Sequence, residues 1–97
     1  MASAKRVEFR GQEFEYDPEA LEAPWVVFAL SLVGKAGSNM ADFIEALNLV
    51  FCGRAVECLR RVPDADGNAP GPLGCSGEDM GALCQAVMED AGRAAKN

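Results

Sequence analysis

The fold of this chain is decided near its start, by Val7-Glu8-Phe9-Arg10-Gly11-Gln12-Glu13-Phe14-Glu15-Tyr16-Asp17-Pro18. Apolar and polar residues alternate on both sides of Gly11, and this period of two is typical of strands with one covered face. Gly11 can adopt the positive φ that a tight turn between two strands requires. We therefore predict an antiparallel hairpin over residues 6–16, with strands at 6–10 and 13–16. Because a lone hairpin is marginally stable in water, we expect it to pack against the helices that follow.

Four helices are predicted after the hairpin, over residues 24–33, 40–51, 54–62 and 77–95. Asp17-Pro18 is a helix-start signal, because the carboxylate can cap a helix that begins with proline, and residues 19–22 fit a single turn. Ser76, followed three residues later by Asp79, is typical of a capping box. The predicted fold class is mainly α, with about four helices and a small N-terminal antiparallel β-hairpin, in a single domain over residues 1–97.

Apolar residues at helical spacing predict which helix faces form the core. The first helix has a wide apolar face that contains Trp25 and Phe28, and in the second helix Ile44 widens the stripe of Phe43 and Leu47. The side chains that we expect in the core are Trp25, Phe28, Phe43, Leu47 and Leu83.

The segment 63–75 predicts a flexible surface loop, because its first twelve residues contain three prolines and three glycines. Asp64, Asp66 and Asn68 superficially resemble the start of a calcium-binding loop. Such a loop also needs a distal bidentate glutamate, which would have to lie near Cys75 and is missing. We therefore expect no calcium site here.

Four cysteines, Cys52, Cys58, Cys75 and Cys84, form an even set that invites a disulfide or zinc interpretation. The chain contains no Cys-x-x-Cys pair and no histidine to complete a zinc site. Cys52, Cys58 and Cys84 fall among apolar residues of predicted helices, where reduced cysteine behaves as a small hydrophobic residue. We expect core cysteines, with a disulfide or a metal site as the alternatives.

Charge and composition narrow the classes of function. The formal net charge is −6, and the nine basic residues are scattered, so we expect neither nucleic-acid nor membrane binding. The longest apolar run, 25–30, is far shorter than the ~20 residues that cross a bilayer, and no secretion signal precedes it. The protein is therefore expected in the cytoplasm. Without histidine, paired carboxylates or a phosphate-binding glycine loop, we predict no enzyme, no catalytic residue and no cofactor.

The number of large apolar side chains favours protein binding instead. One tryptophan, five phenylalanines and four methionines exceed what so small a core requires. We predict an exposed apolar groove for a helical partner or for a second copy of the chain, because methionine adapts to irregular partners. Its predicted residues are Met40, Phe51, Met80 and Met88.

Three segments together resemble a known family. They are residues 9–18, the helix end Leu49-Val50-Phe51-Cys52-Gly53, and residues 80–92. The order of elements and these segments are similar to the small tail assembly chaperones of long-tailed bacteriophages and prophages. The resemblance implies a non-enzymatic protein that binds the tape measure protein in the bacterial host cell, keeps it soluble and helps recruit tail tube subunits.

Many such chaperones are made in two forms through a programmed ribosomal frameshift. Ala95-Lys96-Asn97 can be encoded by a slippery run, so we expect a longer form that continues in the −1 frame. Lysine and asparagine are also ordinary residues at a helix C-terminus, which is the alternative explanation. For the chain as a whole, the alternative function is an unrelated small acidic helical protein–protein interaction module, such as an adaptor or a regulator.

Overall fold

The computed structural model describes residues 4–31 and 40–96, and of Met40 and residues 93–96 only the backbone. Along the described chain the elements are β1 (Lys5–Phe9), β2 (Gln12–Tyr16), the 3-10 turn η1 (Ala20–Glu22), α1 (Pro24–Ser31), α2 (Met40–Val50), α3 (Ala55–Leu59) and α4 (Gly77–Lys96). The predicted fold class, mainly α with an N-terminal antiparallel hairpin, is confirmed. The predicted end of the first helix, at residues 32–33, lies outside the described residues.

The hairpin forms where the alternating pattern predicts it, in the register Val7↔Phe14. Its turn consists of Arg10 and Gly11, with φ of 51° and 84°. Two positive φ angles in succession match the right-handed twist of the flanking strands, and this is why a two-residue turn is favoured here. Arg10 therefore belongs to the turn and not to the first strand, which begins one residue earlier than predicted, at Lys5.

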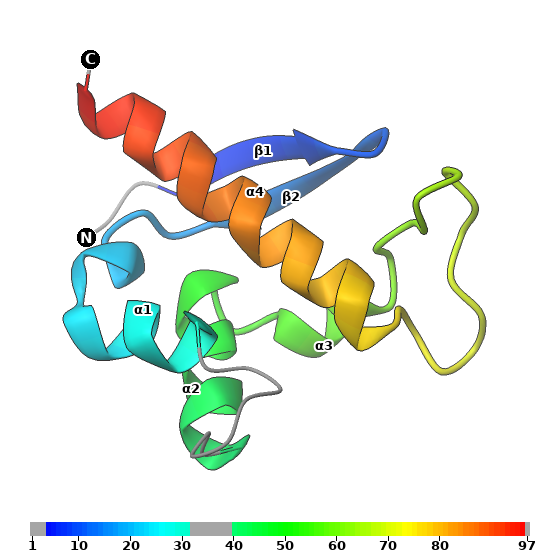
Figure 1. The fold of residues 1–97 in the computed structure, drawn as a ribbon, viewed down its shortest axis with the longest axis horizontal. Helices are drawn as coiled ribbons and strands as arrows, with labels where there is room; N and C mark the ends of the chain where they lie inside the picture. The colour runs from blue at the N-terminus through cyan, green and yellow to red at the C-terminus, as the bar shows by residue number, and fades with distance from the viewer. Residues whose placement is uncertain (1–3, 32–39, 97) are drawn as a thin grey trace.

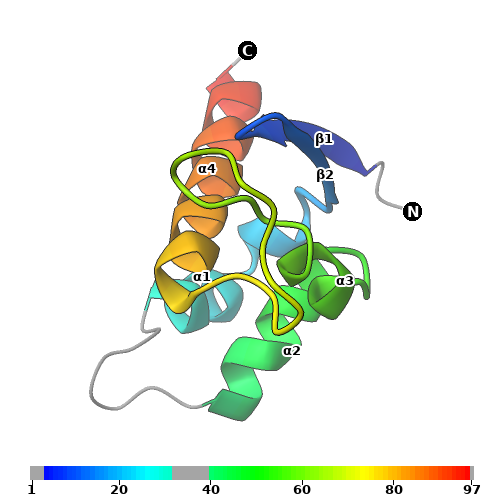
Figure 2. The same ribbon diagram turned by 90° about the vertical axis from the view of Figure 1, so that its right-hand side faces the viewer.

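Helix α4, the longest helix, crosses the molecule diagonally (Figure 1). The hairpin lies along α4: its open end is near the C-terminal half of the helix, where the Tyr16 hydroxyl donates to Asp90 Oδ2, and its turn is near the start of the helix, where Arg10 binds Asp79. Helix α2 lies on the other side of the molecule from the hairpin in both views (Figures 1 and 2). One cluster of buried side chains fills the space between them, with contributions from both strands and all four helices. Its members are Val7, Phe14, Tyr16, Val26, Leu30, Phe43, Ala46, Leu47, Val50, Phe51, Ala55, Cys58, Val62, Leu83, Cys84 and Val87.

Three of the five predicted core residues, Phe43, Leu47 and Leu83, lie in this cluster. The prediction for Trp25 and Phe28 is wrong, because their side chains are 44% and 64% exposed. Their helix buries Val26 and Leu30 instead, which are one turn apart on another face. None of the eight residues of α1 is charged, so the apolar pattern could not show which face turns inward.

Helix α3 is shorter than predicted and ends at Leu59 rather than at Val62. The reason is local. Val62 precedes Pro63, and the proline ring disfavours helical backbone in the residue before it. Val62 is nevertheless fully buried, so the chain continues along the core after the helix has ended.

Candidate protein-interaction surface

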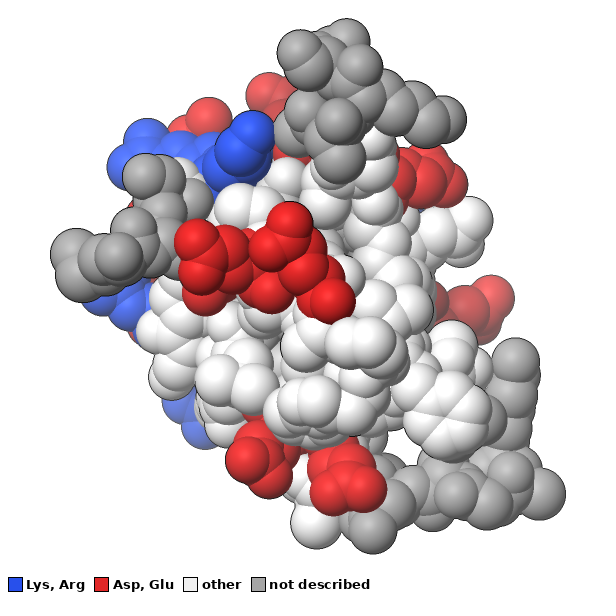
Figure 3. Space-filling view, turned by 90° about the vertical axis from the view of Figure 1, so that its left-hand side faces the viewer, with Lys and Arg blue, Asp and Glu red and all other residues white. Residues whose placement is uncertain are grey.

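Several large apolar side chains remain exposed on the described part of the molecule. Trp25, Val27 and Phe28 of α1 form what we call the α1 surface. Figure 3 views the side on which η1 and α1 lie, and shows a broad uncharged area between two groups of acidic side chains, with basic side chains only toward one edge. Helix α1 is apolar on every face, which is typical of a helix that is covered on every side. In the isolated chain one side of it is left uncovered.

A second exposed apolar region lies along α2. It is a hollow of about 780 Å³ that we call the α2 groove, lined by Asp17, Ala41, Ile44, Glu45, Asn48, Leu49, Cys52 and Gly53. Ile44 is 50% and Leu49 46% exposed. The opposite face of the helix is buried through Phe43, Leu47 and their neighbours, so α2 is apolar on both faces. The prediction that Ile44 extends the buried stripe is wrong.

Backbone contacts hold the polar residues of the α2 groove in place. The Asp17 N–H donates to the Val50 carbonyl at 2.7 Å, which ties the end of β2 to the end of α2. The Asp17 side chain accepts a hydrogen bond from the Glu19 N–H at 2.9 Å. The Gly53 N–H donates to the Asn48 carbonyl at 2.6 Å. At one end of the groove these hydrogen bonds hold the backbone on either side of Asp17 and orient its carboxylate.

A third region, which we call the α4 groove, is a hollow of about 440 Å³ between the N-terminal part of the chain and α4. It is lined by Lys5, Pro18, Leu21, Glu22, Val27, Met88, Ala91 and Gly92. Val27 also belongs to the α1 surface, so the two regions are continuous at this residue. The charged residues of this groove have opposite signs, Lys5 and Glu22, whereas the described residues of the α2 groove supply only carboxylates, Asp17 and Glu45.

The structure does not bring the four predicted binding residues together in one groove. Met88 lines the α4 groove, and Met80 is half-buried against the core. The side chain of Met40 lies outside the described residues. The prediction that Phe51 is exposed is wrong, since its side chain is only 1% exposed.

The burial of Phe51 follows from how α2 ends. The two residues after it, Cys52 and Gly53, have φ of 57° and 80°. This left-handed backbone stops the helix and reverses the chain, so that Phe51 points into the core while Cys52 is left exposed. The prediction of Cys52 as a core residue is wrong for the same reason, because it lies beyond the helix.

None of the four cysteines forms a disulfide, and two of them lie in the core. Cys58 and Cys84 are buried, and Cys75 is half-buried. Burial raises the pKa of the Cys84 thiol to about 12, and burial likewise raises the pKa of Cys58 and of Cys75. Among the described residues, no group of three or more potential ligands could hold a metal ion.

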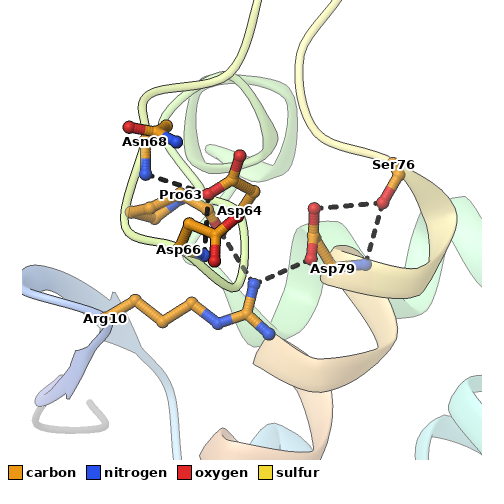
Figure 4. A network of polar contacts seen from close by, with 7 residues as sticks. All are labelled: Arg10, Pro63, Asp64, Asp66, Asn68, Ser76 and Asp79. Carbon is orange, nitrogen blue, oxygen red and sulfur yellow. Dashed lines mark hydrogen bonds and ion pairs between the residues drawn. The ribbon is translucent and has the colours of Figure 1, made fainter.

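A polar network around Arg10 lies where the hairpin turn meets the loop before α4 (Figure 4). The Arg10 Nη1 donates to the Pro63 carbonyl at 2.9 Å and to Asp79 Oδ1 at 2.7 Å. The hydrogen bond from Arg10, and after it the one that the Ser76 hydroxyl donates to Asp79 Oδ2, lower the pKa of the Asp79 carboxyl. The Ser76 hydroxyl accepts the Asp79 N–H at 3.1 Å, as the predicted capping box requires. The network joins three segments of the chain and has a structural role.

The acidic residues of the loop also have a structural role. Asp64 Oδ1 accepts hydrogen bonds from the N–H groups of Asp66 and Asn68, both at 2.9 Å (Figure 4). An aspartate that binds the backbone N–H two residues later forms an Asx-turn. The pattern that resembles a calcium loop in the sequence thus shapes a turn.

No helix in the described ranges combines the length and the apolar character that a membrane span requires. Comparison of the chain with protein-family models, curated proteins and solved structures gave no match.

Proposed function

We propose that this protein is a tail assembly chaperone of a long-tailed bacteriophage or prophage, which binds the tape measure protein in the host cytoplasm and helps recruit tail tube subunits. The observation that carries the proposal is the α1 surface. A helix without a charged residue leaves Trp25 44% and Phe28 64% exposed. Each Å² of apolar surface removed from water contributes roughly 25 cal/mol, so a partner that covers these rings gains affinity from them. The resemblance of residues 9–18, 49–53 and 80–92 to this family supplies the identity of the partner.

The charge of the chain suits a chaperone for an apolar partner. Glu22 borders the α4 groove, and Glu45 the α2 groove. With a net charge of −6, complexes of the chain with an apolar segment repel one another and stay dispersed. The proposed function requires no catalysis. It requires only an exposed apolar surface from which a partner helix displaces water.

The test is coexpression with the product of the longest reading frame downstream of the gene. The wild-type chain is expected to keep that product in the soluble fraction and to copurify with it. The double variant Trp25→Ser, Phe28→Ser is expected to lose both effects, because it removes the exposed rings and leaves the buried residues in place.

Val56→Ser is the matched control, since Val56 is also 64% exposed but belongs to α3. It is expected to behave as the wild type. The proposal fails if the downstream product does not bind the wild-type chain, or if the double variant binds it as well as Val56→Ser does. Circular dichroism of each variant establishes that it is folded.

An unrelated helical adaptor or regulator is the alternative function, and it would use the same exposed surface. The gene neighbourhood separates the two. A tail tube gene upstream and a very long tape measure gene downstream are expected for the chaperone, and other neighbours favour the adaptor. Copurification with the tail tube protein tests the second partner, and sedimentation of the purified chain tests whether it associates with itself.

A further inference from the structure

We propose that the α2 groove takes one class of partner segment, an amphipathic helix whose apolar stripe is flanked by lysine and arginine. This inference rests on the proposed function and specifies the chemistry of the segment that is bound. Three features of the groove support this inference: the length of its apolar wall, the sign of its charges, and the repulsion between like charges that a second copy of the chain would meet there.

The apolar wall of the groove has the length that a short helix can match. Ala41, Ile44 and Leu49 line it from one side of α2. Ala41 and Leu49 are eight positions apart, which at 1.5 Å per residue is about 12 Å, or slightly more than two helical turns. A partner helix with apolar residues at positions i, i+3, i+4 and i+7 presents a stripe of about the same length.

The described residues that line the groove carry charges of one sign. Among the described residues that line the groove, only Asp17 and Glu45 are charged, and both are carboxylates. Carboxylates at the edge of an apolar groove attract a segment with lysine or arginine beside its apolar stripe, within a Debye length of about 8 Å at physiological salt.

A second copy of the chain is a poor occupant of the same groove. In a two-fold symmetric dimer through this face each groove faces its equivalent, so that Asp17 and Glu45 of one chain meet a surface whose described charges are also carboxylates. Four carboxylates would then be brought together at an apolar interface, where like charges oppose association. The charge pattern therefore favours a basic partner over self-association through this face.

The test uses two labelled peptides of 18 residues that share leucines at i, i+3, i+4 and i+7. One has lysine at the flanking positions and the other has glutamate. Fluorescence anisotropy of the full chain with each peptide is expected to show binding of the lysine peptide at least about tenfold tighter than that of the glutamate peptide at low salt. The difference is expected to shrink at 0.5 M salt, because exposed charges are then screened.

Two pairs of variants locate the effect. Glu45→Lys is expected to weaken binding of the lysine peptide about three- to tenfold. Glu57→Lys makes the same change of charge on α3, outside the groove, and is expected to have little effect. Ile44→Ser is expected to weaken binding of both peptides, whereas Val56→Ser is expected to leave binding of both unchanged.

The proposal is overturned if the two peptides bind equally, if neither binds, or if Glu57→Lys acts as strongly as Glu45→Lys. Its failure can be told apart from that of the proposed function. If the tape measure protein copurifies with the chain through the α1 surface but the peptides do not discriminate, only the inference about charge is wrong. If the lysine peptide binds as expected but the tape measure protein does not, the family assignment is wrong and the groove chemistry stands.

Discussion

The substitution Leu83→Ala tests the packing of α4 on the rest of the fold, and the chain provides a matched control. Leu83 is fully buried in the first half of α4, whereas Leu73, in the loop before it, is 99% exposed. Leu73→Ala removes the same atoms from a side chain that contacts almost nothing. Comparison of the two substitutions therefore isolates the contribution of burial from any effect of the leucine-to-alanine change on the unfolded chain.

The magnitude follows from burial. Removal of three buried carbon groups loses about 2.4 kcal/mol of transfer free energy at about 0.8 kcal/mol each, and the cavity that is left brings the cost to about 3 kcal/mol or more. A domain of this size has a free energy of unfolding of roughly 5–15 kcal/mol. Leu83→Ala therefore removes a large fraction of it, and is expected to lower the Tm by about 12–24 °C.

Thermal and urea unfolding followed by circular dichroism measure both variants. Leu73→Ala is expected to stay within about 0.5 kcal/mol of the wild type. Equal Tm values for Leu83→Ala and Leu73→Ala would refute the packing described for α4, because a fully buried and a fully exposed leucine would then contribute equally.

Three further predictions concern local contacts. Ser76→Ala removes the cap of α4 and is expected to cost about 0.5–2 kcal/mol of unfolding free energy, measured by urea unfolding. Because Arg10 lowers the pKa of Asp79 from its ordinary 3.8, the ionised carboxyl stabilises the fold above that pH, and this contribution is lost as the pH falls through the lowered pKa. Arg10→Ala is therefore expected to lower the Tm at pH 7, by a margin that narrows below pH 3.8. Alkylation mapped by mass spectrometry is expected at Cys52 first, and at Cys84 only on unfolding, because burial raises the pKa of its thiol to about 12.

Local chemistry explains which parts of the fold could be predicted from the sequence. The period-two alternation around Gly11 predicts the hairpin, and the capping box at Ser76 predicts the start of α4. Both features depend on residues that are close together in the chain. The core faces of α2 and α4 could be predicted through Phe43, Leu47 and Leu83, because Phe43 and Leu47 are one helical turn apart and Leu83 shares a face of α4 with Val87.

The binding surface could not be predicted in the same way. Helix α1 has no polar side to contrast with its apolar side, so only the tertiary fold decides that Val26 turns inward and Phe28 outward. Phe51 lies at helical spacing with the buried stripe of α2, but its burial also depends on the left-handed turn that follows the helix. The one residue in the sequence that indicates the α2 groove is Ile44. Phe43 and Leu47 already form the buried stripe of the helix, and Ile44 lies on the other side of the helix, where it is not needed for the core.

The most direct test of the central claim uses Trp25, because it is the only tryptophan of the chain and lies on the α1 surface. Its emission reports whether that surface is covered. With a tryptophan-free fragment of the tape measure protein, we expect the emission maximum to move to shorter wavelength and iodide quenching to decrease, to the same extent in Val56→Ser. Formation of the complex, detected by sedimentation, with unchanged emission and quenching of Trp25 would show that the partner binds elsewhere and would contradict the claim.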